Sequence, residues 1–151
     1  MGTNINKNFN IIMTNIENGI YPETPRLPID EPFKNENGEI HNLAHGKFST
    51  LTLIDSLPNT IRANHYHKTD WHISYIVSGS IKYFWKKLNE NTLYSEVYNK
   101  GDSFFSPPMV PHAMYFPEKT TFITVSRNTR SHENHENDLV RIKIISLEDC
   151  K

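Results

Sequence analysis

Short stretches of alternating apolar and polar residues occupy most of the chain from Phe48 onwards, and turn-forming residues separate them. A period of two places one face of a strand against a core, and β-branched and aromatic residues favour strands. Nine strands are predicted on this basis, over residues 48–54, 60–67, 71–77, 81–85, 93–98, 103–106, 113–116, 121–126 and 139–145. So many short strands without a helix between them predict an all-β barrel or sandwich.

The beginning of the chain has a different pattern. A short helix is predicted there from apolar residues at helical spacing, namely Ile5, Phe9, Ile12, Met13 and Ile16. Residues 21–36 contain four prolines, and proline is excluded from helix interiors and central strands. Asn37 and Gly38 then favour a tight turn. We therefore expect an N-terminal arm over residues 1–37, followed by one barrel domain over residues 38–151.

Composition limits the class of protein and its partners. A chain of 151 residues is long enough for one domain with a sizeable core. The net charge of -1, with dispersed lysines and arginines, predicts neither nucleic acid nor an anionic membrane as a partner. No apolar run is long enough to span a bilayer. The only cysteine, Cys150, excludes an internal disulfide and favours a reducing, cytoplasmic location.

Four histidines stand out among the predicted strands. His65 and His67 project from the same face of one strand, because the side-chain period of a strand is two. A turn over residues 68–70 allows the next strand to return His72 to the same cavity, and His112 follows a proline-rich corner. Neutral imidazoles bind zinc, nickel, copper and ferrous iron. We therefore predict that these four histidines line one polar cavity and hold a divalent metal ion.

The spacing of these residues resembles the two motifs of the cupin superfamily, over residues 59–79 and 101–116. Three positions differ from the family pattern. His72 stands where a glutamate is usual, Met109 replaces a glycine, and Phe116 replaces the last asparagine. The resemblance implies a double-stranded β-helix, or jelly-roll barrel, with a metal site. Because a histidine replaces the carboxylate, zinc, iron, nickel and manganese all remain candidates for the ion.

Two segments resemble cupins that modify nucleotide-linked sugars. Residues 62–68 and 106–114 resemble the dTDP-4-keto-6-deoxyglucose 3,4-ketoisomerases, and residues 64–67 with 77–79 resemble the zinc-binding cupin domain of capsule-sugar epimerases. The resemblance implies an epimerase or ketoisomerase that acts on a nucleotide-linked 4-keto sugar in surface-polysaccharide biosynthesis.

This hypothesis gives roles to individual side chains. Moving a proton next to a ketone needs a base and a group that stabilises the enolate oxygen, and a metal on the four histidines could be that group. In a metal-free site, the ketoisomerase resemblance implies that His65 and His67 share the acid and base roles. Tyr83 is the candidate phenol donor. The candidate substrate-binding residues are Arg62 and Arg127, which could hold phosphate, and Met114.

Two other classes of function stay open. One is a mononuclear non-haem metal dioxygenase, because a histidine-rich site suits ferrous iron and leaves positions for substrate and oxygen. The other is a non-catalytic cupin that binds a small sugar or acid. Fold alone does not choose among these classes.

Two further expectations concern the ends of the chain. Residues 127–137 are rich in Asn, Ser and Glu and are predicted to form a solvated loop. An exposed sheet edge invites pairing with another chain, and sugar-modifying cupins are commonly dimers. We therefore expect a homodimer in which the N-terminal arm crosses to, or packs beside, the partner barrel. An arm that folds back over its own sheet is equally compatible with the sequence.

Overall fold

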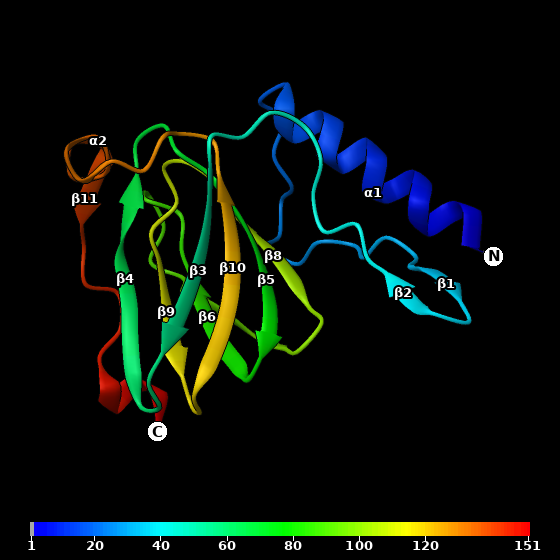
Figure 1. Ribbon diagram of the computed structural model, residues 1–151. Helices are drawn as coiled ribbons and strands as arrows, with labels where there is room; N and C mark the ends of the chain where they lie inside the picture. The colour runs from blue at the N-terminus through cyan, green and yellow to red at the C-terminus, as the bar shows by residue number, and fades with distance from the viewer. Residues whose placement is uncertain (1) are drawn as a thin grey trace.

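Two antiparallel sheets face each other and form a jelly-roll barrel in the computed structural model, which describes residues 2–151, with side chains from residue 8 onwards (Figure 1). The strand orders are β3-β10-β5-β8 and β11-β4-β9-β6-β7. The strands are β3 (Thr50–Ser56), β4 (Thr60–His67), β5 (His72–Ser78), β6 (Ser80–Trp85), β7 (Tyr94–Asn99), β8 (Ser103–Ser106), β9 (His112–Phe116), β10 (Thr120–Ser126) and β11 (Leu139–Arg141). The predicted all-β jelly roll is confirmed.

The last predicted strand is longer than the observed one. β11 pairs with β4 only over Leu139–Arg141, opposite residues 65–67. Beyond that point β4 contains a bulge, where Ala63 and Asn64 adopt positive φ angles of 72° and 55°. The Asn64 side chain then accepts the backbone N–H groups of residues 144 and 145, which replaces the regular ladder. The prediction of a strand to residue 145 is therefore wrong over its second half.

Large side chains fill the barrel interior below the site. The buried cluster consists of Ile76, Ile81, Tyr83, Tyr98, Phe104, Phe116 and Phe122. Along β10 the apolar Phe122 belongs to this cluster, whereas Thr124, two residues further, lines a cavity above it. The barrel interior thus contains a packed apolar core and, above it, a polar cavity.

The predicted N-terminal helix is confirmed as α1 (Gly2–Glu17), although the side chain of Ile5 lies outside the described residues. Its buried residues Phe9, Met13 and Ile16 pack against the outer face of the first sheet, together with Trp71. This apolar contact explains why asparagine-rich sequence is helical, since tertiary packing outweighs helix propensity. No helix among residues 2–151 is long and apolar enough to cross a membrane.

The proline-rich arm folds back on its own barrel. Leu27 donates its backbone N–H to Ser103 (3.0 Å), and Phe105 donates to the carbonyl oxygen of Pro25 (2.8 Å). The arm therefore covers the β8 edge of the first sheet. A hairpin of β1 (Phe33–Asn35) and β2 (Gly38–Ile40) follows and projects away from the barrel (Figure 1). The expected domain boundary, between residues 37 and 38, falls within this hairpin.

Candidate metal and substrate site

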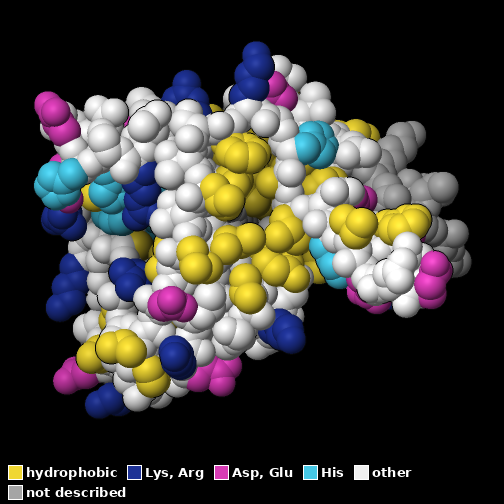
Figure 2. Space-filling model, viewed as in Figure 1, with side chains coloured by type: hydrophobic (Ala, Val, Ile, Leu, Met, Phe, Trp, Pro, Cys, Tyr) yellow, Lys and Arg dark blue, Asp and Glu magenta, His cyan; other side chains and the backbone are white. Residues whose placement is uncertain are grey.

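A cavity of about 390 Å³ lies between the two sheets, at the end of the barrel that α2 (His132–Asp138) borders. His65, His67, His72 and His112 all line it. Figure 2 shows histidine and basic side chains side by side on this part of the surface. The structure thus brings the four predicted histidines into one cavity.

Strand register explains why these histidines meet. His65 and His67 alternate with Tyr66 on β4, and His112, the first residue of β9, is the register partner of His65. The ring centroids of His65 lie 4.8 Å from His67 and 5.0 Å from His112. β5 begins at His72, whose ring centroid is 4.7 Å from that of His67.

The donor atoms form two overlapping sets. In the first set, His65, His67 and His112 each offer a nitrogen, and these atoms lie within 4.8 Å of one another. The second set contains His67, Asp70 and His72 under the same limit. The Nε2 atom of His72 lies 3.0 Å from Oδ2 of Asp70 and makes a hydrogen bond with it. A three-histidine site is therefore the simplest metal site, and a role for His72 as a fourth ligand stays a prediction.

In two histidines, hydrogen bonds at Nδ1 leave the other ring nitrogen, Nε2, as the one that can bind a metal. Nδ1 of His112 donates to the carbonyl oxygen of Val110 (3.1 Å), and Nδ1 of His67 faces Oδ2 of Asp138 (3.3 Å). A neutral imidazole with a proton on Nδ1 carries its lone pair on Nε2. Nε2 of His67 is buried and has no hydrogen-bond partner among the described residues. A buried imidazole nitrogen without a partner fits a metal ligand.

The protonation states fit the same chemistry. Burial, with repulsion from the neighbouring imidazoles, lowers the pKa of His65 to about 2. Burial likewise lowers the pKa of His112 to about 3 and that of His67 to about 4. All three rings are consequently neutral near pH 7, and the neutral ring is the form that binds a metal ion.

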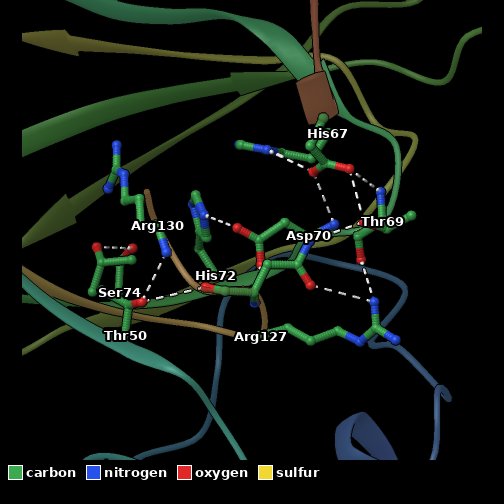
Figure 3. A network of polar contacts seen from close by, with 11 residues as sticks. Thr50, His67, Thr69, Asp70, His72, Ser74, Arg127 and Arg130 are labelled. Atoms are coloured by element: carbon green, nitrogen blue, oxygen red, sulfur yellow. Dashed lines mark hydrogen bonds and ion pairs between the residues drawn. The ribbon is translucent and has the colours of Figure 1, made fainter. Parts of the chain in front are cut away.

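Two aspartates contact the histidines, and Figure 3 shows one of them, Asp70, beside His72. Asp70 is buried, binds His72 through one carboxylate oxygen and accepts the backbone N–H of Asn128 through the other (2.9 Å). Burial opposes its ionisation, but the hydrogen bond from His72 and the attraction of that ring contribute to a lowered pKa of Asp70. Asp138 faces His67 at Nδ1 instead.

The predicted phosphate-binding arginines lie in different places. Arg62 lines the cavity and is held by Ser56 Oγ (2.7 Å) and the carbonyl oxygen of Asp55 (3.0 Å). Arg127 lines other surface pockets, and its Nη1 donates to the carbonyl oxygen of Thr69 (3.2 Å), as Figure 3 shows. Arg130 lines the cavity, and its guanidinium has no hydrogen bond or ion pair among the described residues. The structure thus joins Arg62 and Arg130 to the histidines and separates Arg127 from them.

The two other predicted residues have contrasting positions. Met114 lines the cavity. Tyr83 is fully buried beneath it, its hydroxyl shares a hydrogen bond with Ser106 Oγ (2.8 Å), and its ring stacks on His112 at a centroid distance of 5.8 Å. Burial raises the pKa of Tyr83. Tyr83 therefore supports the cavity wall, and contact with a ligand would have to pass through Ser106, which does line the cavity.

The sequence prediction of a solvated loop over residues 127–137 is wrong for residues 132–137, which belong to the helix α2. The Ser131 side chain caps this helix by accepting the backbone N–H of Asn134 (3.3 Å). α2 brings His135 to the cavity, with its ring centroid 5.7 Å from that of His67. A serine followed by an acidic residue in the first turn, Glu133, is the sequence signal that could have indicated this helix.

Comparison with known proteins agrees with this arrangement. The cupin family model matches residues 29–145, which include both motifs and every residue that lines the cavity. The chain belongs to the cupin family. No curated protein sequence matches this cupin.

Several solved structures share the fold of this cupin at low sequence identity. The sugar 3,4-ketoisomerase QdtA from Thermoanaerobacterium thermosaccharolyticum, in complex with TDP, is 16% identical, with a TM-score of 0.61 over 74% of this chain and 82% of that one. CapF, a capsular polysaccharide assembling protein from Staphylococcus aureus, is 14% identical, with a TM-score of 0.58 over 78% of this chain and 35% of CapF. RmlC, a 3,5-epimerase from Legionella pneumophila in complex with dTDP-4-keto-L-rhamnose, is 12% identical, with a TM-score of 0.62 over 76% and 70% of the two chains.

Proposed function

We propose that this cupin is an isomerase that moves a proton next to the ketone of a nucleotide-linked 4-keto sugar, as an epimerase or ketoisomerase of surface-polysaccharide biosynthesis. The observation that carries the proposal is the buried cluster of neutral histidines in a cavity of about 390 Å³. Within this cluster, Nε2 of His67 has no hydrogen-bond partner among the described residues. The structural relatives named above include enzymes bound to TDP or to a dTDP-4-keto sugar, which supports the same substrate class.

In this proposal His65, His67 and His112 hold a divalent ion, with His72 as a possible fourth ligand. A bound divalent ion would supply a Lewis acid that polarises the ketone oxygen. Zinc, iron, nickel and manganese remain candidates, and elemental analysis of protein purified without a histidine tag identifies the ion. In the metal-free form of the proposal, His65 and His67 carry the proton between the two carbons.

The cavity mouth would receive the phosphate groups. Arg62 and Arg130 line the cavity, and a guanidinium binds phosphate through two parallel hydrogen bonds. Arg130 is available for this contact because its side chain has no ion pair among the described residues. Met114 would contact the sugar. Arg127 belongs to another surface, so we assign the second phosphate contact to Arg130 in its place.

Solvent-deuterium exchange tests the reaction directly. The protein, with and without each added metal, is incubated in deuterium oxide with a panel of dTDP- and UDP-4-keto sugars, and mass spectrometry follows the label. We expect incorporation of deuterium next to the ketone with at least one sugar. The variant Arg130→Gln should raise KM, while Lys47→Gln, a change at a residue that does not line the cavity, leaves the rate unchanged. No incorporation into any sugar would contradict the proposal.

One observation favours a second function. His67, Asp70 and His72 form a set of two histidines and one carboxylate, a combination typical of non-haem ferrous iron oxygenases. Iron at about one ion per chain, together with oxygen consumption, would favour a dioxygenase over the isomerase. If instead every ligand that binds is recovered unaltered after long incubation, the protein is a non-catalytic binding cupin.

We also propose a cytoplasmic location, where nucleotide-linked sugars and a reducing environment coincide. The single cysteine, Cys150, is free and fits that environment.

A further inference from the structure

Asp138 connects the C-terminal part of the chain to the histidine cluster. It is the last residue of α2 and directly precedes β11, which pairs with the strand that carries His65 and His67. In that pairing Leu139 lies opposite His67, and the N–H of Lys68 donates to the carbonyl oxygen of Asp138 (2.9 Å). The β11–β4 register therefore holds the Asp138 side chain beside the turn that follows His67.

The Asp138 carboxylate accepts hydrogen bonds on both oxygens. Oδ1 accepts from the backbone N–H (3.0 Å) and the hydroxyl (2.7 Å) of Thr69. Oδ2 accepts the backbone N–H of Asp70 (3.1 Å) and faces Nδ1 of His67 (3.3 Å). Burial opposes ionisation of this carboxyl group, but the hydrogen bonds from Thr69 and Asp70 outweigh it and lower the pKa of Asp138. An ionised carboxylate only accepts hydrogen bonds, so the facing nitrogen must carry a proton.

We propose that Asp138 is a positioning residue that holds His67 in the tautomer with its proton on Nδ1 and thereby aims the Nε2 lone pair into the cavity. The inference rests on the proposed function only where it takes His67 as a metal ligand. A carboxylate behind a metal-binding histidine fixes the orientation of the ring and raises its basicity. Asp138 would thus make His67 ready for a ligand before any ligand arrives.

Asp70 cannot replace Asp138 in this role. Asp70 binds Nε2 of His72, so it occupies the nitrogen that corresponds to the free one of His67. The two aspartates therefore have opposite effects on the rings that they contact. Among the histidines of the first donor set, His112 obtains the same tautomer as His67 from the Val110 carbonyl oxygen, and His67 obtains it from a side chain. A substitution can remove the second of these hydrogen bonds but not the first.

Histidine tautomers in the metal-free protein test the inference without substrate. Long-range proton–nitrogen NMR spectra of protein labelled with ¹⁵N-histidine and treated with EDTA distinguish the two tautomers at neutral pH, and His67→Gln assigns the signal. We expect His67 to carry its proton on Nδ1 in the wild type. Asp138→Ala should convert it to a mixture or to the Nε2–H form. Glu133→Gln, which removes an equal charge from the same helix, should leave it unchanged.

Metal affinity provides a second readout. We expect Asp138→Ala to weaken binding of Zn²⁺ by roughly 10- to 100-fold in a chelator competition, and Glu133→Gln to change it less than twofold. If Asp138→Ala fails to fold, Asp138→Asn replaces it in the test. The two carboxylate oxygens of Asp138 share the present hydrogen bonds, and the amide of asparagine has only one acceptor oxygen. A folded variant that keeps the Nδ1–H tautomer of His67 in full would overturn the inference. Loss of the tautomer without any isomerase activity in the wild type would overturn only the proposed function.

Discussion

The free Nε2 atom of His67 is the most informative atom in the cavity. A buried nitrogen without a hydrogen bond destabilises a fold by about 1–3 kcal/mol, and His67 is only 1% exposed. The surrounding residues do not relieve this cost, because Asp138 binds the other nitrogen of the ring. A ligand that bonds to Nε2 would therefore stabilise the protein, as is usual for binding that is linked to folding.

The double variant His67→Ala with His112→Ala should abolish binding of the metal ion. Both side chains line the cavity and lie outside the apolar clusters, so the variant should keep the circular dichroism of a folded β protein. Removing ligands from a purely structural zinc site would unfold the chain instead. The matched control is His41→Ala with His45→Ala, which removes two exposed histidines that do not line the cavity. Full metal occupancy in the first variant would show that the proposed site is wrong.

Replacing His72 by glutamate should keep metal binding and shift the preference toward harder ions such as manganese. The new carboxylate would join His67 and the nearby Asp70 in a set with more oxygen donors, which hard ions prefer. Competition between Mn²⁺ and Zn²⁺, followed by elemental analysis, measures the shift. Unchanged selectivity would mean that residue 72 does not contact the ion.

The histidines could be predicted from the sequence, whereas some of their neighbours could not. A period of two and a short turn are local properties, and they placed His65, His67 and His72 in one cavity. Asp138 depends on the pairing of β11 with β4, which no local pattern reveals. The outward position of Arg127 could have been predicted from the strand period of two. Phe122 and Thr124 face the interior, and a residue at odd spacing from them faces outward.

The turn between β5 and β6, which connects the two sheets, depends on one close backbone approach. Gly79 has a φ of +88°, and a Cβ atom there would lie 2.5 Å from the carbonyl oxygen of Lys119. Gly79→Ala should therefore lower the free energy of unfolding by more than about 3 kcal/mol. Gly101→Ala is the matched control, since its φ is +91° but no atom of the described residues lies within 4 Å of the added Cβ. Gly101→Ala should lower the free energy of unfolding by about 1 kcal/mol. Equal urea midpoints for the two variants would contradict the argument.

The contact of α1 with the barrel should contribute measurably to stability. Phe9 is 2% exposed against the first sheet, so Phe9→Ala should lower the free energy of unfolding by about 3 kcal/mol. Ile11 is 46% exposed on the same helix, and Ile11→Ala should cost less than about 1 kcal/mol. Urea denaturation of both variants makes the comparison. A similar loss in both would mean that α1 does not pack as described.

Among the secondary-structure elements, the regular strands could be predicted from the sequence, whereas bulges and early strand ends could not. Residue alternation identified every barrel strand to within a few residues. The early end of β11 depends on the bulge at Ala63 and Asn64, and left-handed backbone at an alanine has no sequence signal. The pairing of Leu27 with Ser103 likewise joins segments that are far apart in the chain.

The whole molecule keeps apolar surface that a second copy could cover, and we predict a homodimer. Leu51 and Leu53 of the edge strand β3 are 67% and 65% exposed, and Figure 2 shows a broad apolar patch on this side. Phe33 and Ile40, paired across the projecting hairpin, are 61% and 64% exposed. Hairpins of this size are marginal alone, so packing on a partner barrel would stabilise it.

Light scattering measures the assembly. Because the arm contributes Phe9 and Leu27 to the core, truncation before Gly38 would expose the sheet, and point variants are more informative. Phe33→Glu with Ile40→Glu should convert the dimer to a folded monomer. Lys34→Glu, on the same hairpin, should leave the dimer intact. A monomeric wild type would contradict the prediction, and a dimer that survives the double change would exclude the hairpin from the interface.

The order of β11 in the chain also has a consequence for synthesis. Every barrel strand that carries one of the four cavity histidines leaves the ribosome before Asp138 does, and β11 must then find β4 across all the strands between them. Closing a long loop costs entropy, and contacts between distant segments form slowly. A nascent barrel would therefore present His67 in either tautomer until the final segment docks. We expect the chain to acquire full affinity for the proposed ion only after β11 has left the ribosome and paired with β4.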